Sequence, residues 1–294
     1  MDHLRIVVLG IVQGITEFLP ISSDGHLVVA GRIFALTGGP SLDHDDVLET
    51  IILHLGTLMA ILVVYWREIW RIVACDRRAV GLLIIGTIPA AISGLLLKKF
   101  CESWLTDPRL TGAMLLVNGL LLFWIGRRAD GRLSYAELTY RQALLIGLCQ
   151  AAAPLPGISR SGTTIFGGLA VGLKRADAAT FSFLLAIPAI SGAVVVALLD
   201  LFQGQTTAST PAELAGGAVV SFLVGIVALR QFLYWLNAGR LNAIAWRCFG
   251  WWCLGLGTVV LCWQFVNPPK MSSRGINGLL RHAVLVDLAS EFVE

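Results

Sequence analysis

Residues 156–165, PGISRSGTTI, interrupt an otherwise apolar part of the chain and decide how its fold is interpreted. Apolar stretches flank them at 142–153 and 164–173, yet the interruption contains Arg160, several hydroxyl side chains, two glycines and a proline. At the depth of a bilayer, irregular backbone is tolerated only where protein buries it or where it lines a wet cavity. The stretch is therefore typical of a re-entrant hairpin whose tip forms part of a functional site.

The composition supports a membrane setting. Of the 294 residues, 56% are hydrophobic and only 14% are charged, whereas soluble domains have about 25% charged residues. The net charge of +3 gives no indication of nucleic-acid binding, and no GxGxxG or P-loop motif is present. The six cysteines form no close CxxC pair, so we interpret them as small hydrophobic residues rather than a disulfide or zinc framework.

Apolar runs outside the interruption are long enough to span a bilayer, which takes about 20 residues. Two further apolar segments, residues 4–35 and 142–173, are each broken by a Pro/Gly/Ser tip and predict two re-entrant hairpins. The sequence thus predicts an all-α polytopic membrane protein. Its six predicted spanning helices lie near residues 50–66, 79–97, 110–126, 178–199, 214–229 and 248–266.

The two broken segments resemble each other at an offset of 137 residues. The matches are Gly10 with Gly147, Gln13 with Gln150, Ile21 with Ile158, Ser22 with Ser159, and Gly25 with Gly162. Three predicted spans separate the hairpins, so the second should enter from the opposite face and form an inverted-topology repeat with a site near the midplane. We predict one membrane domain, residues 1–267, with repeats at about 4–126 and 142–266, and a polar tail at 268–294.

Loop charges predict the orientation. Three loops rich in arginine are expected on the cytoplasmic side, namely 67–78, 127–141 and 230–247. The acidic 36–49 loop and the 200–213 loop, which has no Lys or Arg, are expected outside. Parity also places the 98–109 loop outside, although it contains two lysines and an arginine.

The second tip has the residues of an anion site. Glycines and small hydroxyl residues let backbone N–H groups converge on an anion, and a helix that begins near Ser161 or Gly162 adds a positive dipole end. The guanidinium of Arg160 fits phosphate with two parallel hydrogen bonds, and Ser159 and Thr164 can donate further ones. The alternative is that Arg160 extends to the interface and the serines only cap a helix.

The first tip has complementary groups. Glu17 lies four residues after Gln13, on the same helix face, and Ser22, Ser23 and His26 follow. His26 is three residues after Ser23, so the two side chains can meet on a helix. A carboxylate, a hydroxyl and an imidazole can perform nucleophilic or general acid–base chemistry. The alternatives are a helix-cap role for His26 and a simple inter-helix hydrogen bond for Gln13.

Other polar residues are expected to have structural roles. We expect His54, in the apolar stretch ILHLGTLMA, to make a polar contact between helices rather than to act in the site. Three acidic residues, Asp43, Asp45 and Asp46, are interpreted as a solvated loop rather than a cation site. Trp251, Trp252 and Trp263 are interpreted as interfacial or lipid-facing residues.

Both motifs together resemble the undecaprenyl-diphosphatase family of the bacitracin-resistance type. That family has a (Glu/Gln)xxxGlu motif leading into Pro-x-Ser-Ser-x-Gly-His, and residues 13–26 read QGITEFLPISSDGH. Its second motif, Pro-Gly-x-Ser-Arg-Ser-x-x-Thr, corresponds to PGISRSGTT at residues 156–164. The stretches LHLGTLMA and FSFLLAIPA are also similar, and the resemblance covers about residues 4–266.

The resemblance implies an enzyme that hydrolyses undecaprenyl diphosphate to undecaprenyl phosphate, recycling the lipid carrier of peptidoglycan synthesis and conferring bacitracin resistance. It further implies a divalent cation, Mg²⁺ or Ca²⁺, a multi-pass location in the bacterial inner membrane with a site facing the periplasm, and a homodimer as an allowed assembly. By resemblance, the catalytic residues are Glu17, Ser23, His26 and Arg160, and the substrate-binding residues are Gln13, Ser22, Ser159, Arg160, Ser161 and Thr164. Gly162, where the helix after the second tip is expected to begin, is also predicted to bind substrate. Glu17 is the candidate metal ligand, but Gln13 stands where many members have Glu, which leaves the metal ligands open.

Three chemistries remain open at this stage. We favour attack by Ser23 with His26 as its base, followed by direct attack of His26 and then by metal-activated water. The rival function is a lipid-phosphate transporter or flippase, because inverted repeats with broken helices also build transporters. The Ser-Ser-x-Gly-His cluster favours the enzyme, since transport does not need it.

Overall fold

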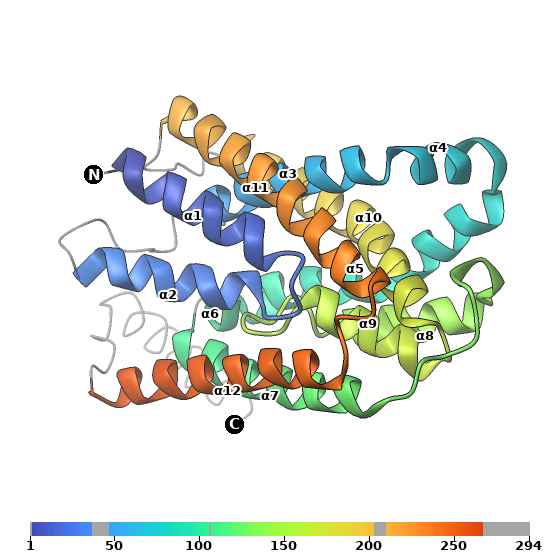
Figure 1. Ribbon diagram of the computed structural model, residues 1–294. Coiled ribbons are helices and arrows are strands. Elements are labelled where there is room, and N and C mark those ends of the chain that lie inside the picture. Colours follow the sequence, from blue (N-terminus) through green and yellow to red (C-terminus); the bar gives the residue numbers. More distant parts are fainter. Residues whose placement is uncertain (1, 37–46, 106, 203–209, 267–294) are drawn as a thin grey trace, which may run out of the picture. The chain divides into compact units, whose positions relative to one another are not determined.

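The computed structural model describes residues 2–36, 47–105, 107–202 and 210–266, and these residues form helices and no β-strand. The all-α prediction is confirmed. The chain divides into two compact units, Met1–Leu261 and Cys262–Glu294, and the features below belong to the first. The helices are α1 (Asp2–Thr16), α2 (Ser23–Leu36), α3 (Val47–Val64), α4 (Trp66–Cys75), α5 (Arg77–Phe100), α6 (Glu102–Leu105), α7 (Pro108–Arg127), η2 (Tyr135–Glu137), α8 (Tyr140–Gln150), α9 (Arg160–Ala170), α10 (Arg175–Phe202), α11 (Pro211–Asn237) and α12 (Ala243–Val266) (Figure 1).

All six apolar runs predicted to span a membrane fall within helices. Helices α5, α7, α10, α11 and α12 are each long and apolar enough to cross a bilayer, and α3 with α4 forms a sixth candidate that bends by 74° at Tyr65. Among the described residues the chain therefore has five such helices, or six if the bent pair is one span. This supports a multi-pass membrane protein.

The 67–78 segment, predicted to be a loop, is largely helix α4, and that prediction was wrong. Trp66 and Trp70 are exposed on one side of the helix while Ile72 is buried on the other. Exposed aromatic residues beside charged residues are typical of a helix at a membrane–water interface. The arginines of this segment thus decorate an amphipathic helix instead of a loop.

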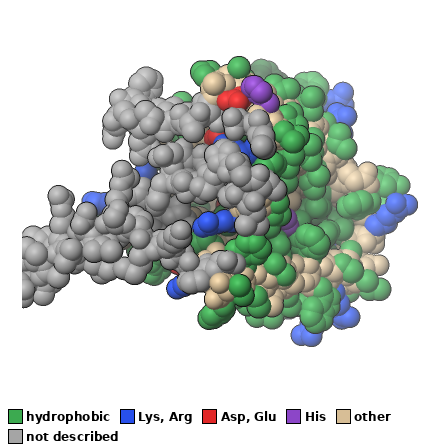
Figure 2. Space-filling model, turned by 90° about the vertical axis from the view of Figure 1, so that its left-hand side faces the viewer, with side chains coloured by type: hydrophobic (Ala, Val, Ile, Leu, Met, Phe, Trp, Pro, Cys, Tyr) green, Lys and Arg blue, Asp and Glu red, His purple; other side chains and the backbone are tan. Residues whose placement is uncertain are grey.

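Lipid-facing surface is visible along the spanning helices. On α5, four aliphatic side chains at helical spacing are about half exposed, namely Ile84, Ile88, Ile92 and Leu95. Figure 2 shows hydrophobic side chains over much of the described surface on the face it presents. A soluble monomer rarely exposes so large an apolar area, so this surface is suited to contact with acyl chains.

The two broken segments are helix–break–helix units, as predicted. The first consists of α1 and α2 with a tip at residues 17–22, and the second consists of α8 and α9 with a tip at 151–159. None of the four helices reaches the length of about 20 residues that a span needs. Figure 1 shows α1 and α2 toward the end where the N-terminus lies, and α8 and α9 toward the opposite end.

The first helix of each broken segment packs against a long helix distant in sequence. Helix α1 packs on α11, and α8 packs on α5. A Cβ atom added at Gly10 would lie 2.8 Å from the carbonyl oxygen of Gly217, and one added at Gly147 would collide with the carbonyl oxygen of Gly86. The glycines matched at the 137-residue offset therefore both permit a close helix–helix approach.

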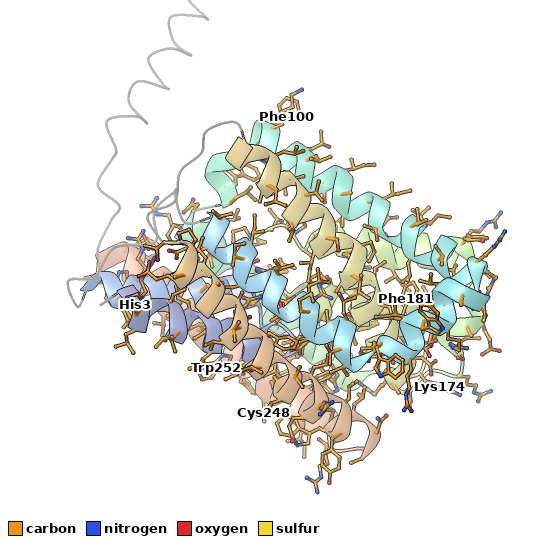
Figure 3. The ribbon with its side chains drawn as sticks, turned by 90° about the horizontal axis from the view of Figure 1, so that it is seen from above. His3, Phe100, Lys174, Phe181, Cys248 and Trp252 are labelled. Atoms are coloured by element: carbon orange, nitrogen blue, oxygen red, sulfur yellow. The ribbon has the colours of Figure 1, made fainter. Side chains whose placement is uncertain are left out.

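The segments rich in arginine lie at one end of this unit. Arg71 donates to the hydroxyl of Tyr135, and Arg78 donates to the carbonyl of Ala136 at 2.6 Å, which joins residues 67–78 to 127–141. One cavity is lined by residues of both the 127–141 and 230–247 segments, among them Asp130 and Asn237. Figure 3 shows Lys174, which also lines that cavity, and His3 at opposite ends.

Three predicted features lie wholly or partly outside the described residues. These are the acidic loop with Asp43, Asp45 and Asp46, half of the 200–213 loop (residues 203–209), and the 268–294 tail.

Candidate active site

Glu17 is the centre of a buried polar network formed where the two tips meet. Its side chain is 7% exposed, and Phe18 next to it packs its ring edge-on against Phe183 in the core, with ring centroids 5.8 Å apart. Gln13, one helical turn earlier, donates from Nε2 to Glu17 Oε2 at 3.0 Å. Ser23 donates from Oγ to the same oxygen at 2.8 Å. The carboxylate is thus held within hydrogen-bond reach of a serine hydroxyl.

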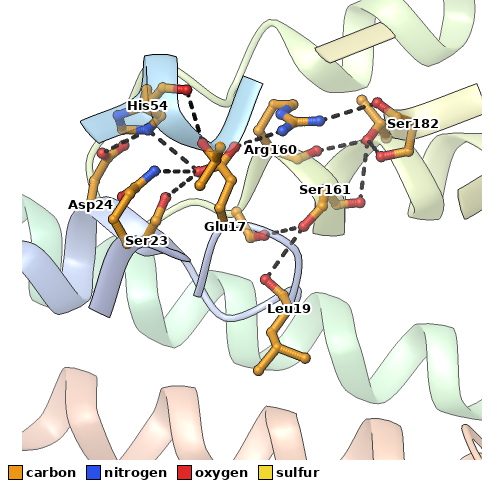
Figure 4. A network of polar contacts seen from close by, with 12 residues as sticks. Glu17, Leu19, Ser23, Asp24, His54, Arg160, Ser161 and Ser182 are labelled. Atoms are coloured by element: carbon orange, nitrogen blue, oxygen red, sulfur yellow. Dashed lines mark hydrogen bonds and ion pairs between the residues drawn. The ribbon is translucent and has the colours of Figure 1, made fainter. Parts of the chain in front are cut away.

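Arg160 connects the second tip to this carboxylate. Its Nη2 donates to Glu17 Oε1 at 2.7 Å, and its Nη1 donates to the carbonyl oxygen of Ser182 at 3.1 Å. Figure 4 shows the resulting chain of contacts, in which Arg160 approaches Glu17 from one side and Ser23 from another. The predicted opposition of Arg160 and the first tip is therefore present in the structure.

Asn118 of α7 joins the two tips, and nothing in its sequence context singled it out. Its Nδ2 donates to the carbonyl of Pro20 at 2.9 Å, and its Oδ1 accepts from the backbone N–H of Ser159 at 3.1 Å. The residue is fully buried within the apolar α7. A buried polar side chain in a spanning helix is a signal that could have identified it.

The hydroxyls of the second tip are buried and bonded to protein. Ser159 Oγ and Ser161 Oγ lie 3.1 Å apart, and Ser161 also donates to the carbonyl of Leu19 at 3.4 Å. Thr164 Oγ1 donates to the carbonyl of Arg160 at 2.8 Å and lies 2.6 Å from Ser182 Oγ. These side chains hold the arginine-bearing turn in place.

The backbone of the second tip differs from the predicted open anion nest. The N–H of Ser159 is used by Asn118, that of Gly162 donates to Ser159 Oγ at 3.1 Å, and that of Thr163 donates to the carbonyl of Ser159 at 2.9 Å. The physical reason is that Ser159 caps α9, and its hydroxyl and carbonyl oxygens accept from the N–H groups of Gly162 and Thr163. The guanidinium of Arg160 is the charged anion-binding group at the start of this helix.

His26 does not meet Ser23 as predicted. Its Nδ1 lies 2.7 Å from the carbonyl oxygen of Ser22, and its Nε2 accepts a hydrogen bond of 2.8 Å from Trp252. The two rings also stack, with planes 10° apart. Because both ring nitrogens are engaged elsewhere, the partner of the Ser23 hydroxyl is Glu17 and not His26.

His54 lies in the site, although we expected only an inter-helix contact. Its Nδ1 is 2.7 Å from the carbonyl oxygen of Thr50, and its Nε2 is 3.4 Å from Glu17 Oε2 and 3.7 Å from Asp24 Oδ1. The contact does join α3 to the first hairpin, as predicted, but it joins it at the central carboxylate (Figure 4). Sequence reasoning missed both His54 and Asp24, and the ionisable residue in an apolar helix was the available signal.

The polar network around Glu17 does not fit a divalent cation. Among the residues that the structure describes, no group of three or more His, Cys, Asp or Glu side chains is placed to hold a metal ion. The Oε1 atom of Glu17 accepts from Arg160, and the Oε2 atom accepts from Gln13 and Ser23. A carboxylate surrounded by hydrogen-bond donors is a poor metal ligand, so the described residues do not fit the implied cation.

The remaining predicted residues are built into the tips. Ser22 has a φ of 70°, in the left-handed region that non-glycine residues seldom adopt, and its Oγ accepts from the N–H of Gly25 at 3.3 Å. Its match in the second tip, Ser159, accepts from Gly162 in the same way. Gln13, Glu17, Ser23 and Arg160 thus come together where the two tips meet. Ser22, Ser159, Ser161 and Thr164 bond within the tips and to neighbouring helices, and His26 bonds to Trp252.

Comparison with known proteins shows the family of this chain. The family model described as Bacitracin resistance protein BacA matches residues 6–259. An undecaprenyl-diphosphatase of Rhodopirellula baltica is 48% identical over 261 residues, which cover 88% of this chain and 97% of that protein. Undecaprenyl-diphosphatase 3 of Bacillus cereus is 38% identical over 91% of this chain and 99% of its own length. An undecaprenyl-diphosphatase of Methanosphaera stadtmanae is 34% identical over 89% of this chain and 98% of its own length. A family match over most of the chain, with relatives aligned along nearly their whole lengths, shows that the chain belongs to the bacitracin resistance protein BacA family.

Proposed function

We propose that this protein is an undecaprenyl-diphosphatase, an integral membrane hydrolase that converts undecaprenyl diphosphate to undecaprenyl phosphate and inorganic phosphate. The observation that carries the proposal is the placement of one hydroxyl, one carboxylate and one guanidinium in contact: Ser23, Glu17 and Arg160. The names of its relatives support the same activity. This activity would recycle the lipid carrier of peptidoglycan synthesis and confer resistance to bacitracin.

The first chemical step is attack by Ser23 on the terminal phosphorus. As the Oγ–P bond forms, the hydroxyl proton passes to Glu17 Oε2, which lies 2.8 Å away. The bond between the terminal phosphorus and the bridging oxygen breaks, and undecaprenyl phosphate leaves with that electron pair. A carboxylate in hydrogen-bond contact with the nucleophile is placed to act as its general base.

The second step returns the enzyme to its starting state. Water attacks the phosphoserine, the P–Oγ bond breaks, and the serine oxygen takes back the proton that Glu17 stored. The protons of the water leave with the released inorganic phosphate. Glu17 therefore acts as base and then as acid, and no group outside the described site is needed to balance the protons.

Arg160 binds and neutralises the diphosphate in this scheme. Its planar guanidinium presents parallel N–H donors that match phosphate oxygens and the charge that develops on them. Its present partners, Glu17 and the Ser182 carbonyl, hold the fork at the point where the two tips meet. Its three other N–H groups are available to bind phosphate.

The metal requirement stays a separate prediction from the family resemblance. We derive no step through Mg²⁺ or Ca²⁺, because the described residues do not form a site for either ion. Phosphate release by purified protein should be measured after treatment with EDTA and after adding each ion back. Loss and recovery of activity would indicate that the ion enters with the diphosphate, since phosphate oxygens are good ligands for it.

For the membrane arrangement, we propose six spans and two re-entrant hairpins in an inverted repeat. The first helix of each hairpin packs on a long helix of the other repeat, α1 on α11 and α8 on α5, which supports this arrangement. The positions of the two hairpins toward opposite ends also support it (Figure 1). Arginines gathered at one end support a cytoplasmic side there. The site then opens toward the periplasm of an inner-membrane protein, and a homodimer is a further assembly to test by cross-linking.

The deciding experiment is release of phosphate from undecaprenyl diphosphate by detergent-solubilised protein. No membrane then separates two sides, so a flippase without hydrolase activity produces no signal. We expect steady phosphate release from the native chain and almost none from Ser23→Ala. Native protein that binds undecaprenyl diphosphate without releasing phosphate, with and without added Mg²⁺ or Ca²⁺, would contradict the enzyme and favour the transporter.

A further inference from the structure

Arg160 has one positive charge to share between Glu17 and a bound diphosphate. Its Nη2 is bonded to Glu17 Oε1 and its Nη1 to the carbonyl of Ser182, which uses two of its five N–H groups. In the proposed reaction, the remaining N–H groups bind phosphate, and the charge that balances Glu17 then faces a second anion. The contact with Glu17 is the one that the negative substrate competes for directly, because both are anions bound by the same cation.

Sharing that charge has a consequence for Glu17. The carboxylate is 7% exposed, and a buried charge whose counter-ion also serves a second anion is destabilised. Gln13 and Ser23 remain as donors until the attack, when Glu17 takes the Ser23 proton, but both donors are neutral. A second positive group beside Glu17 would keep the carboxylate ionised and oriented in that interval.

His54 meets this requirement by geometry. Its Nδ1 lies 2.7 Å from the carbonyl oxygen of Thr50, which accepts only, so this nitrogen carries a hydrogen. Its Nε2 lies 3.4 Å from Glu17 Oε2 and 3.7 Å from Asp24 Oδ1, so it faces two carboxylates. A ring whose two nitrogens both face acceptors is suited to the imidazolium form, in which both nitrogens are donors.

Asp24 orients the ring. It lies one residue after Ser23 in the first turn of α2, and with Glu17 it brackets the Nε2 edge of the imidazole. His54 itself is placed by α3, a helix outside both hairpins, so it does not move with either tip. His54 can therefore hold the Glu17 carboxylate of the first tip from a separate helix.

We propose that His54, oriented by Asp24, is a positioning residue that holds the ionised Glu17 in place while Arg160 binds the diphosphate. The inference rests on the proposed function for the identity of the ligand, a lipid diphosphate. The pairing of two interchangeable cations with one buried carboxylate can be tested without any substrate.

The first test measures the melting temperature of detergent-solubilised variants. We expect Arg160→Ala and His54→Leu each to lower it modestly, because the other cation still compensates Glu17. The double variant should fall about 5 °C further than the sum of the two, since the carboxylate then has no counter-ion. Adding Glu17→Gln to the double variant should recover most of that extra loss.

Additive losses in the double variant, or no recovery with Glu17→Gln, would overturn the proposal. This readout needs no catalysis, so it stands even if the protein releases no phosphate. Conversely, a native chain without phosphatase activity would refute the proposed function and leave the result of this cycle unaffected.

The second test separates kcat from KM. We expect His54→Leu to lower kcat about 100-fold with KM changed by no more than about threefold, because the residue holds the ionised Glu17 in place for the attack and does not bind the substrate. His54→Gln, whose amide can donate near the position of Nε2, should recover at least about tenfold of that loss. His3→Gln, which removes an exposed imidazole bonded to Glu213, is the matched control and should behave like the native chain.

A third test removes the charge of Asp24. Asp24→Asn should lower kcat in the native background and have little effect in the His54→Leu background, because it acts through the imidazole. A native-like kcat in His54→Leu would overturn the proposal. So would a His54→Gln variant no more active than His54→Leu, or an Asp24→Asn effect that persists undiminished without His54.

Discussion

The first tip, residues 17–22, and the second tip, residues 151–159, have the same local bond at the start of the helix that follows. In each, a serine hydroxyl accepts from the N–H of a glycine three residues later, Ser22 from Gly25 and Ser159 from Gly162. The tips differ in where the chain turns. Ser22 itself adopts the left-handed conformation in the first tip, whereas Gly157 adopts it in the second.

The tips also differ in what their side chains do. Hydroxyls of the second tip are buried and bonded to one another or to backbone carbonyls, so they hold Arg160. Ser23, just after the first tip, is partly exposed and donates to a carboxylate. The same backbone motif therefore stands beside a carboxylate in the first hairpin and a guanidinium in the second. The internal resemblance predicts the shape of the tips and not the role of their side chains.

Serine substitutions just after the two tips, at Ser23 and Ser161, should give the largest difference in activity. Ser23→Ala is expected to lower phosphate release about a thousandfold, because the nucleophile is lost. Ser161→Ala should stay within about tenfold of the native rate, because its hydroxyl bonds Ser159 and a backbone carbonyl. Initial rates at saturating undecaprenyl diphosphate measure both. Equal losses in the two variants would break the distinction between the tips.

The same pair of variants can identify the covalent intermediate. A rapid acid quench with a labelled terminal phosphate should trap an adduct that resists acid, is lost in base and disappears in Ser23→Ala. These are the properties of phosphoserine, while phosphohistidine shows the reverse. An acid-labile adduct that persists in Ser23→Ala would reassign the nucleophile to a histidine.

Arg160→Lys should have the next largest effect, a loss of about 100-fold in kcat/KM. Lysine keeps the charge but cannot place two donors in the plane that reaches Glu17 and the Ser182 carbonyl. Arg71→Lys is the control, since that arginine is exposed and pairs with Glu68 on its own helix. A native-like rate in Arg160→Lys would show that charge alone matters at the second tip.

The backbone difference between the tips should give the smallest effect, in stability. Gly157→Ala should lower the free energy of unfolding by about 2 kcal/mol, because alanine is strained at a φ of 97° and its Cβ would collide with the carbonyl of Thr111. Ser22→Gly should stay within about 1 kcal/mol, since glycine relieves the left-handed strain while the cap to Gly25 is lost. Melting temperatures in detergent measure both, and the reverse order would mean that the first tip is the more constrained.

Much of the fold could be predicted because its causes are local. Apolar length predicts spanning helices, and Pro, Gly and Ser clusters predict breaks, so the long helices and both tips were located from the sequence. The helical α4 was missed because its apolar and charged residues alternate at an interface, where composition alone resembles a loop. It leaves α3 at a bend of 74°, and its Ile72 packs with Ala79 of α5 and Leu184 of α10, residues that are distant from α3 in the sequence.

The sequence by itself determined the membrane class, the two broken hairpins and part of the site, namely Glu17, Ser23 and Arg160. Residue type and spacing along one helix are enough for that, because they depend on only a few neighbouring residues. The tertiary structure alone decided which imidazole faces the carboxylate, turning His26 toward Trp252 and placing His54 from α3 beside Glu17. Such choices depend on the packing of helices far apart in the chain, and no local periodicity specifies which buried charge will meet which counter-ion.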